Sequence, residues 1–189
     1  MKKLFYINFY VIVTFCLTGP TLADTDHGVN LYFKEDYAAA LAEFSECAAN
    51  GDADAQYWLG LMHESGTGVE QDYLEARKWY ERAADQGEVG AQLQLAELYF
   101  SGHGTEKNYV LAHMWFDIAA KQGLKFASRS RERVALGMIE SDIIRARQMA
   151  GAWRPRMSGY AAEDAYARAR EAMNNPFSLW SLETLFSGD

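Results

Sequence analysis

The sequence repeats itself at a fixed interval. Gly51, Gly87 and Gly123 follow one another every 36 residues, and many identical pairs share this spacing. They include Ala55 and Ala91, Leu59 and Leu95, Gly66 and Gly102, Gly68 and Gly104, Tyr73 and Tyr109, Ala76 and Ala112, and Trp79 and Trp115. Such a period indicates a stack of one supersecondary unit, in which neighbouring units bury each other's apolar faces. A stack presents an extended surface, which favours binding over catalysis.

Each unit is predicted to be a pair of helices. In the clearest unit, apolar residues at helical spacing predict a first helix over about 52–65. Gly66 and Gly68 then end it, because glycine tolerates the positive φ angles of a tight reversal. Asp72 is a suitable N-cap for a second helix, which Gly87 ends. The fold class is therefore all-α, a solenoid of helical hairpins.

Large side chains and partial units complete this prediction. We expect Trp79 and Tyr80 to fill the wedge between their own helix pair and the next. A partial unit precedes the full ones, with a short helix around 29–33. Another partial unit follows Gly123 but lacks the glycine pair, and Ser141 is a candidate cap for its last helix.

The two ends of the chain differ from the repeat. Lys2 and Lys3 precede a mostly apolar stretch, and a cut after Ala23 suits a signal peptidase. The stretch is short for a membrane span, so an uncleaved anchor is the weaker alternative. We expect a signal peptide over 1–23, a repeat domain over 24–157 with full repeats at about 52–87 and 88–123, and a helical extension over 158–189. The mature protein is then periplasmic or secreted, without a membrane span.

Charge and cysteine content exclude some functions. The net charge of −8 becomes −10 when the two leader lysines are removed, so the mature chain repels phosphate backbones. Nucleic acid is therefore a poor candidate partner. Cys47 is then the only cysteine, which excludes an intramolecular disulfide. It occupies the repeat position of Ala83 and Ala119, so we expect a small buried apolar residue.

The sequence contains no evident catalytic or metal-binding constellation. None of the four histidines is spaced for zinc, and His63 falls at a packing position. The carboxylates, Asp85 among them, fall mainly at caps and on faces expected to be exposed. Neither G-x-S-x-G nor a phosphate loop is present. We therefore expect no enzyme, no cofactor and no metal. The alternative, an envelope hydrolase, requires a buried, charge-perturbed residue beside a closed pocket.

These residues resemble the Sel-1-like repeat family, which is related to the tetratricopeptide repeat. One copy of its motif runs through Ala55, Leu59, Gly60, Gly66, Gly68, Val69, Asp72, Ala76, Trp79, Tyr80, Ala83, Ala84 and Gly87. The other runs through Ala91, Leu95, Tyr99, Gly102, Gly104, Ala112, Trp115, Phe116, Ala119, Ala120 and Gly123. The resemblance implies a right-handed α/α superhelix and a non-enzymatic adaptor that holds other proteins. Cysteine-rich relatives that act on β-lactams have paired cysteines, which this chain lacks.

The resemblance also suggests a binding surface. In tetratricopeptide relatives the first helix of each pair lines a concave groove. Transferred by helix position, the groove residues are Tyr57, Leu61, Glu64, Leu93, Glu97, Phe100, Arg129 and Arg133. Such a strip suits an extended or helical peptide, held by apolar anchors and end charges. The alternative is an ordinary amphipathic surface, with some of these residues packed between units.

The segment after Pro155 departs from the repeat. A helix is predicted over 160–174, and a dense apolar group follows it, formed by Phe177, Leu179, Trp180, Leu182, Leu185 and Phe186. Such a group favours burial over exposure to water. It either covers the last repeat, fills the protein's own groove, or docks on a partner or another copy, which would make the protein a self-assembling element.

Overall fold

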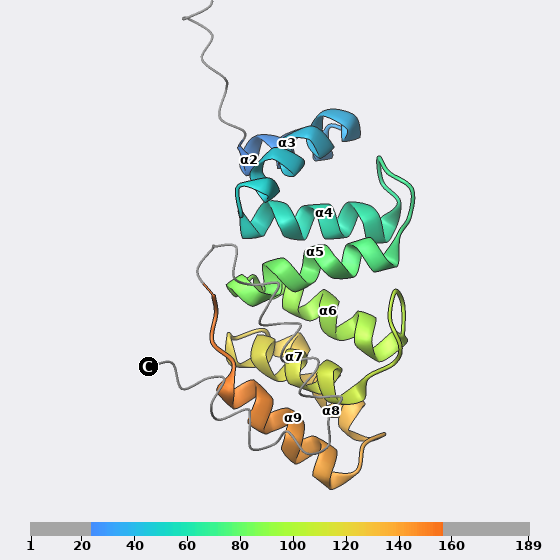
Figure 1. Cartoon of the computed structure of the whole chain (residues 1–189), viewed down its shortest axis with the longest axis vertical. Coiled ribbons are helices and arrows are strands. Elements are labelled where there is room, and N and C mark those ends of the chain that lie inside the picture. The colour runs from blue at the N-terminus through green and yellow to red at the C-terminus, as the bar shows by residue number, and fades with distance from the viewer. Residues whose placement is uncertain (1–23, 157–189) are drawn as a thin grey trace, which may run out of the picture.

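The computed structural model describes residues 24–156, and within this range every regular element is a helix. The helices are α2 (Thr25–Phe33), α3 (Tyr37–Ala49), α4 (Ala53–Ser65), α5 (Tyr73–Gln86), α6 (Val89–Ser101), α7 (Tyr109–Lys121), α8 (Lys125–Ala135) and α9 (Glu140–Ala152). They stack in chain order along the long axis of the molecule, from α2 and α3 at one end to α8 and α9 at the other (Figure 1). The predicted all-α solenoid is confirmed.

Capping residues set the helix boundaries where the sequence placed them. Asp52 caps α4 by accepting a hydrogen bond from the Ala55 amide at 2.7 Å. Asp72 caps α5 by accepting from the amides of Leu74 and Glu75. Gly66 and Gly87 end these two helices in the left-handed conformation. These caps satisfy backbone groups that would otherwise lack partners at the helix ends.

The N-terminal unit is a complete hairpin and not only a partial repeat. Its first helix, α2, begins at Thr25, four residues earlier than predicted. A Cβ atom on Gly28 would lie 2.6 Å from the Phe44 ring, just as one on Gly60 would lie 2.4 Å from the Tyr80 ring. The two glycines therefore hold equivalent positions, but a shorter turn after α2 places them 32 residues apart. The 36-residue period therefore does not reveal that Gly28 and Gly60 are equivalent.

The C-terminal unit does not close as a hairpin. Helix α9 packs mainly against α7 and not against α8. Ser141 lies inside α9, whose N-cap is Ile139 and has no side-chain hydrogen bond, so the predicted Ser141 cap is wrong. The glycine pair that reverses the chain in the two full units is absent here. Without it, the turn between α8 and α9 takes a different course.

Two apolar clusters form the core, and the two large residues of α5 divide between them. Tyr80 is fully buried in the larger cluster, which joins α5 to α9. Trp79 is half-buried against the N-terminal cluster and lies 4.7 Å from the Arg82 guanidinium. The predicted wedge is therefore correct for Tyr80 only, since Trp79 packs against the cluster formed by α3 and α4. Cys47 is buried in the N-terminal cluster, as predicted.

Candidate functional site

The predicted binding residues lie on the first helices of three successive units. Helix α4 carries Tyr57, Leu61 and Glu64, α6 carries Leu93, Glu97 and Phe100, and α8 carries Arg129 and Arg133. We call these eight residues the first-helix strip. The six residues on α4 and α6 are half-buried, whereas the two arginines are exposed. Leu61, Leu93 and Phe100 pack against the edge of the larger core cluster.

Tyr57 is used in packing between two units. A Cβ atom on Gly90, at the start of α6, would lie 2.9 Å from the Tyr57 ring, so the ring rests on that helix. The centres of the Tyr57 and Tyr80 rings are 6.0 Å apart. Burial raises the pKa of the Tyr57 hydroxyl, and the neighbouring Glu88 and Glu64 raise it further. The hydroxyl therefore remains a hydrogen-bond donor at neutral pH.

Glu64 is held by two hydrogen bonds. Its carboxylate accepts from the Tyr80 hydroxyl at 2.6 Å and from the Gln94 amide at 3.2 Å. Burial, followed by the nearby Glu64 charge, raises the pKa of Tyr80 far above its usual range. These contacts join α4, α5 and α6. The interpretation that some strip residues pack between units thus describes Tyr57 and Glu64.

Three other members of the strip form one cluster between α6 and α8. Arg133 donates to both Glu97 carboxylate oxygens, at 3.0 and 3.2 Å. Its guanidinium also lies 5.0 Å from the centre of the Phe100 ring. Arg129, one turn earlier on α8, is exposed and forms no ion pair with any described residue. It is the strip's available cation.

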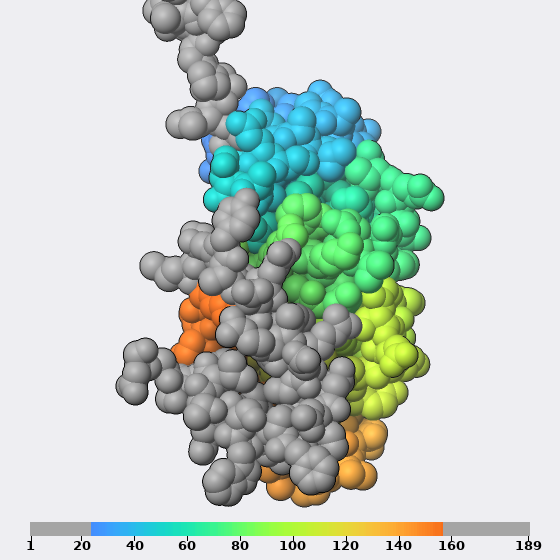
Figure 2. Space-filling model, viewed as in Figure 1, coloured from blue at the N-terminus to red at the C-terminus, as the bar shows by residue number. Residues whose placement is uncertain are grey.

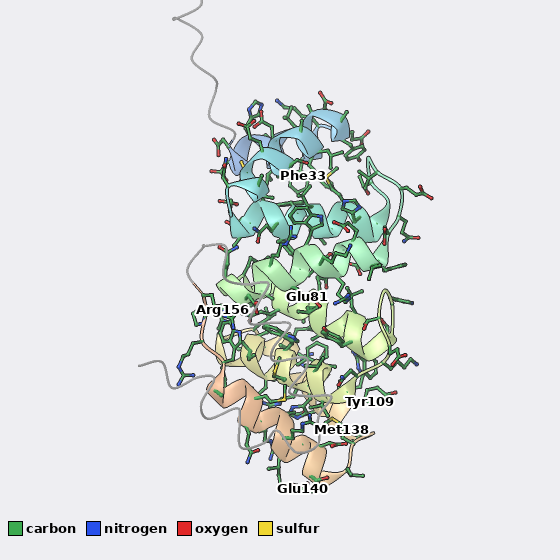
Figure 3. The ribbon with its side chains drawn as sticks, in the orientation of Figure 1. Phe33, Glu81, Tyr109, Met138, Glu140 and Arg156 are labelled. Carbon is green, nitrogen blue, oxygen red and sulfur yellow. The ribbon has the colours of Figure 1, made fainter. Side chains whose placement is uncertain are left out.

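An aromatic group at the N-terminal end extends the strip, and the sequence reasoning missed it. The Tyr32 ring lies 5.1 Å from the Trp58 ring, and Phe33 lies 6.1 Å from Trp58 while remaining 73% exposed. Phe33 lies beside α3 and α4 in Figure 3. The sequence does hold a sign of this group. Gly28 and Gly60 are 32 residues apart, and the same offset places Tyr32 at the repeat position of the strip residue Glu64.

A ladder of glutamines links successive units. Gln86 donates to Gln56 at 2.8 Å, and Gln122 donates to Gln92 at the same distance. Gln56 and Gln92 in turn donate to the carbonyls of the preceding second helices. Gln92 and Gln122 follow Gln56 and Gln86 by 36 residues, so the repeat in the sequence already indicates that the two pairs are equivalent. Because buried amides need partners, the ladder has a structural role.

Asp85 is buried, which corrects the expectation that it lies on an exposed face. It is 8% exposed at the end of α5, and the chain after α9 runs back to it. The Arg156 amide donates to the Asp85 carbonyl at 2.8 Å. Burial raises the pKa of the Asp85 carboxyl to about 6, the nearby Arg156 opposes this rise, and Glu81 adds to it.

The raised pKa of Asp85 makes stability depend on pH. The folded chain holds the Asp85 proton up to about pH 6, whereas the unfolded chain loses it near 3.8. This contribution to stability is therefore present at low pH and lost as the pH rises through 6. We expect Asp85→Asn to be more stable than wild type by about 3 kcal/mol at pH 7, and the difference to vanish near pH 4. Urea unfolding of both proteins at each pH measures it. Parallel pH profiles would contradict the assignment.

The histidines differ in burial. His63 is half-buried, as expected, and its Nδ1 atom has no hydrogen-bond partner. His113 is fully buried in α7 and its Nδ1 atom also lacks a partner. Burial lowers the pKa of His113, and the neighbouring Asp117 partly opposes this effect. Residues 24–156 contain no group of three or more side chains placed to hold a metal ion.

The stacked hairpins and the recurring side chains of their first helices define a helical-repeat protein of the α/α solenoid class. The Sel1 repeat model matches residues 53–88 and 89–124. These residues form two Sel1 repeats, which confirms the resemblance seen in the sequence. Sel1 repeat proteins generally act as protein–protein interaction scaffolds.

Solved structures show the same architecture. A protective antigen of uropathogenic Escherichia coli with an SLR fold is 31% identical, with a TM-score of 0.66 over 78% of this chain and 32% of its own. A Sel1 repeat protein from Oxalobacter formigenes is 26% identical, with a TM-score of 0.57 over 79% of this chain and 60% of its own. This chain thus spans about a third and three fifths of their lengths. No curated protein matches it in sequence.

Two groups of predicted features remain beyond this description. The signal peptide over 1–23 and the apolar tail residues Phe177, Trp180, Leu182 and Phe186 lie outside the described residues. Between Asp24 and Arg156, none of the helices has the combination of length and apolar character that crossing a membrane requires.

Proposed function

We propose that this protein is a non-enzymatic adaptor of the cell envelope that binds a protein or peptide along the first-helix strip. The observation that carries the proposal is the recurrence of half-buried Leu61, Leu93 and Phe100 on two successive first helices, with exposed Arg129 beyond them. Half-buried apolar side chains are fixed in position and yet remain accessible, which suits them as anchors for a partner.

The contacts within the strip favour an extended partner over a compact one. Glu64 and Glu97 are already bonded to Tyr80 and Arg133, so these carboxylates stiffen the strip. The apolar anchors Leu61 and Leu93 and the free cation Arg129 then remain for a ligand. An extended peptide with apolar side chains and an acidic group toward α8 matches this order.

The envelope location is supported by the leader-like residues 1–23. Fusion of residues 1–30 to a reporter active only after export tests it: we expect an active reporter, and a reporter retained inside the cell would contradict the location. The enzyme alternative has weaker support. Asp85 is buried with a raised pKa, but Glu81, the carboxylate that influences it, is bonded to Arg77 and to the Tyr99 hydroxyl and so has a structural role.

A matched pair of leucines tests the binding surface. Leu93 lies in the strip, whereas Leu74 is 48% exposed on the second helix α5. We expect Leu93→Glu to reduce partner capture from an envelope fraction at least tenfold, because an anchor costs about 2 kcal/mol or more when lost. Leu74→Glu should capture as wild type does. Thermal unfolding of both variants shows that they fold, and equal recovery of all partners would reject the strip.

A further inference from the structure

Charge is distributed very unevenly along the solenoid. Residues 24–120 carry 18 acidic and 5 basic side chains, a net charge of −13. Residues 121–156 carry 9 basic and 3 acidic side chains, a net charge of +6. Because the helices stack in chain order, the acidic N-terminal hairpin and the basic α8–α9 unit lie at opposite ends of the molecule (Figure 2). The part of the protein that the structure describes is therefore strongly dipolar along its long axis.

The basic end also exposes apolar side chains. Seven large apolar residues are exposed in the described chain, and four of them belong to this last unit. They are Phe126 at 52%, Leu136 at 91%, Ile139 at 66% and Ile144 at 46%. Met138 and Glu140 mark the turn between α8 and α9, which lies at the tip of the solenoid (Figure 3). The neighbouring Leu136 and Ile139 therefore project from this tip.

Cations without partners accompany these apolar residues. Helix α8 exposes Lys125, Phe126, Arg129 and, just after its last turn, Leu136. Their spacing places Phe126, Arg129 and Leu136 on one side of the helix. Neither Lys125 nor Arg129 forms an ion pair with a described residue, whereas Lys121 and Arg131 both pair with Asp117. We call Lys125, Phe126, Arg129, Leu136 and Ile139 the terminal surface.

We propose that the terminal surface docks on an anionic phospholipid membrane. Basic residues interleaved with exposed aromatic and aliphatic side chains are the combination that binds such an interface, by attraction to the headgroups and shallow apolar burial. Leu136 and Ile139 project outward, which suits a deformable lipid surface better than the rigid surface of a folded partner.

The acidic part of the molecule does not prevent this docking. The first two hairpins, residues 24–87, carry −10 of the net −13 and lie two to three hairpins away along the stack, roughly 20–30 Å at the usual spacing of packed helices. The Debye length at physiological salt is about 8 Å, so their repulsion from the lipid is screened. The same dipole orients the molecule, with the basic end toward the membrane and the acidic end away from it. This inference does not depend on the proposed peptide-binding function.

Vesicle sedimentation with the chain from Asp24 onward tests the proposal. We expect the protein to pellet with vesicles of phosphatidylcholine and phosphatidylglycerol but not with phosphatidylcholine alone, and to be released by high salt. Lys125→Glu plus Arg129→Glu should lower the partition coefficient at least about twenty-five-fold, since each lost cation removes about a fivefold factor. Leu136→Asn plus Ile139→Ser should lower it about tenfold without unfolding, because Ser is also a better N-cap for α9.

Lys34→Glu plus Lys107→Glu is the matched control, since both lysines are exposed in the acidic part and the net charge changes equally. This control should pellet as wild type does. Equal loss in the control, or no pelleting with anionic vesicles, would overturn the proposal. It would also be overturned if the terminal variants instead altered a concentration-dependent mass in sizing experiments, because the surface would then serve a second copy.

Discussion

Replacing Gly104 with alanine is expected to lower the free energy of unfolding by about 3 kcal/mol or more. Gly104 has a φ of +65°, and a Cβ atom there would lie 2.3 Å from the Tyr73 carbonyl oxygen and 2.4 Å from its carbonyl carbon. These are backbone atoms at the start of α5, so no side-chain rotation relieves the clash. The turn would have to move, which would also break the 3.2 Å hydrogen bond from Arg77 to the Gly104 carbonyl.

Gly123 provides the matched control. Its φ is +98°, but a Cβ atom there would have no neighbour within 4 Å. Gly123→Ala should therefore lower the free energy of unfolding by about 1 kcal/mol, the conformational cost of a left-handed alanine. Urea unfolding followed by far-UV circular dichroism measures both variants. Equal losses of stability would show that the contact between the turn and α5 does not matter.

Trp115→Ala is expected to cost about 3–5 kcal/mol, the range for removing a large buried aromatic side chain. Trp115 is 1% exposed in the larger core cluster, and its ring lies 6.1 Å from the Trp153 ring in an edge-on arrangement. Since Trp153 follows α9 directly, the substitution also removes a contact that holds the last helix on α7. Relative to wild type, we expect Trp115→Ala to speed hydrogen exchange in α9 more than in α4.

Trp79 occupies the same repeat position one unit earlier and tests the argument. It is only half-buried, and its other contact is the cation–π pair with Arg82. Trp79→Ala should therefore cost about 1–2 kcal/mol, clearly less than Trp115→Ala. A larger loss for Trp79→Ala would mean that the stack is held together mainly at its N-terminal side.

The regular part of the fold was predictable because each local signal agrees with the repeat. Asp52 and Asp72 are strong N-caps, and Gly66 and Gly87 are strong helix ends, so the hairpins follow from short-range chemistry. The two ends were harder. The shorter turn after α2 changes the offset from 36 to 32 residues, and the place where α9 packs depends on tertiary contacts with α7.

The candidate site was predictable in position but not in detail. Helix position identifies which residues share the first helices, but it does not show which of them pack between units. Tyr57 rests on Gly90, and Glu64 accepts a hydrogen bond from Gln94, because neighbouring hairpins approach closely at these points. The burial of Asp85 depends on the chain near Arg156, 71 residues later, which a local pattern does not contain.

Site-specific photocrosslinking tests the proposed binding surface most directly. A photoreactive phenylalanine analogue is placed in turn at Leu61, Leu93 and Arg129, and at Leu74 as the position on a second helix. In cells, we predict adducts with the same partner from the three strip positions and none from Leu74. Adducts from Leu74 alone, or equally from all four positions, would contradict binding along the first helices.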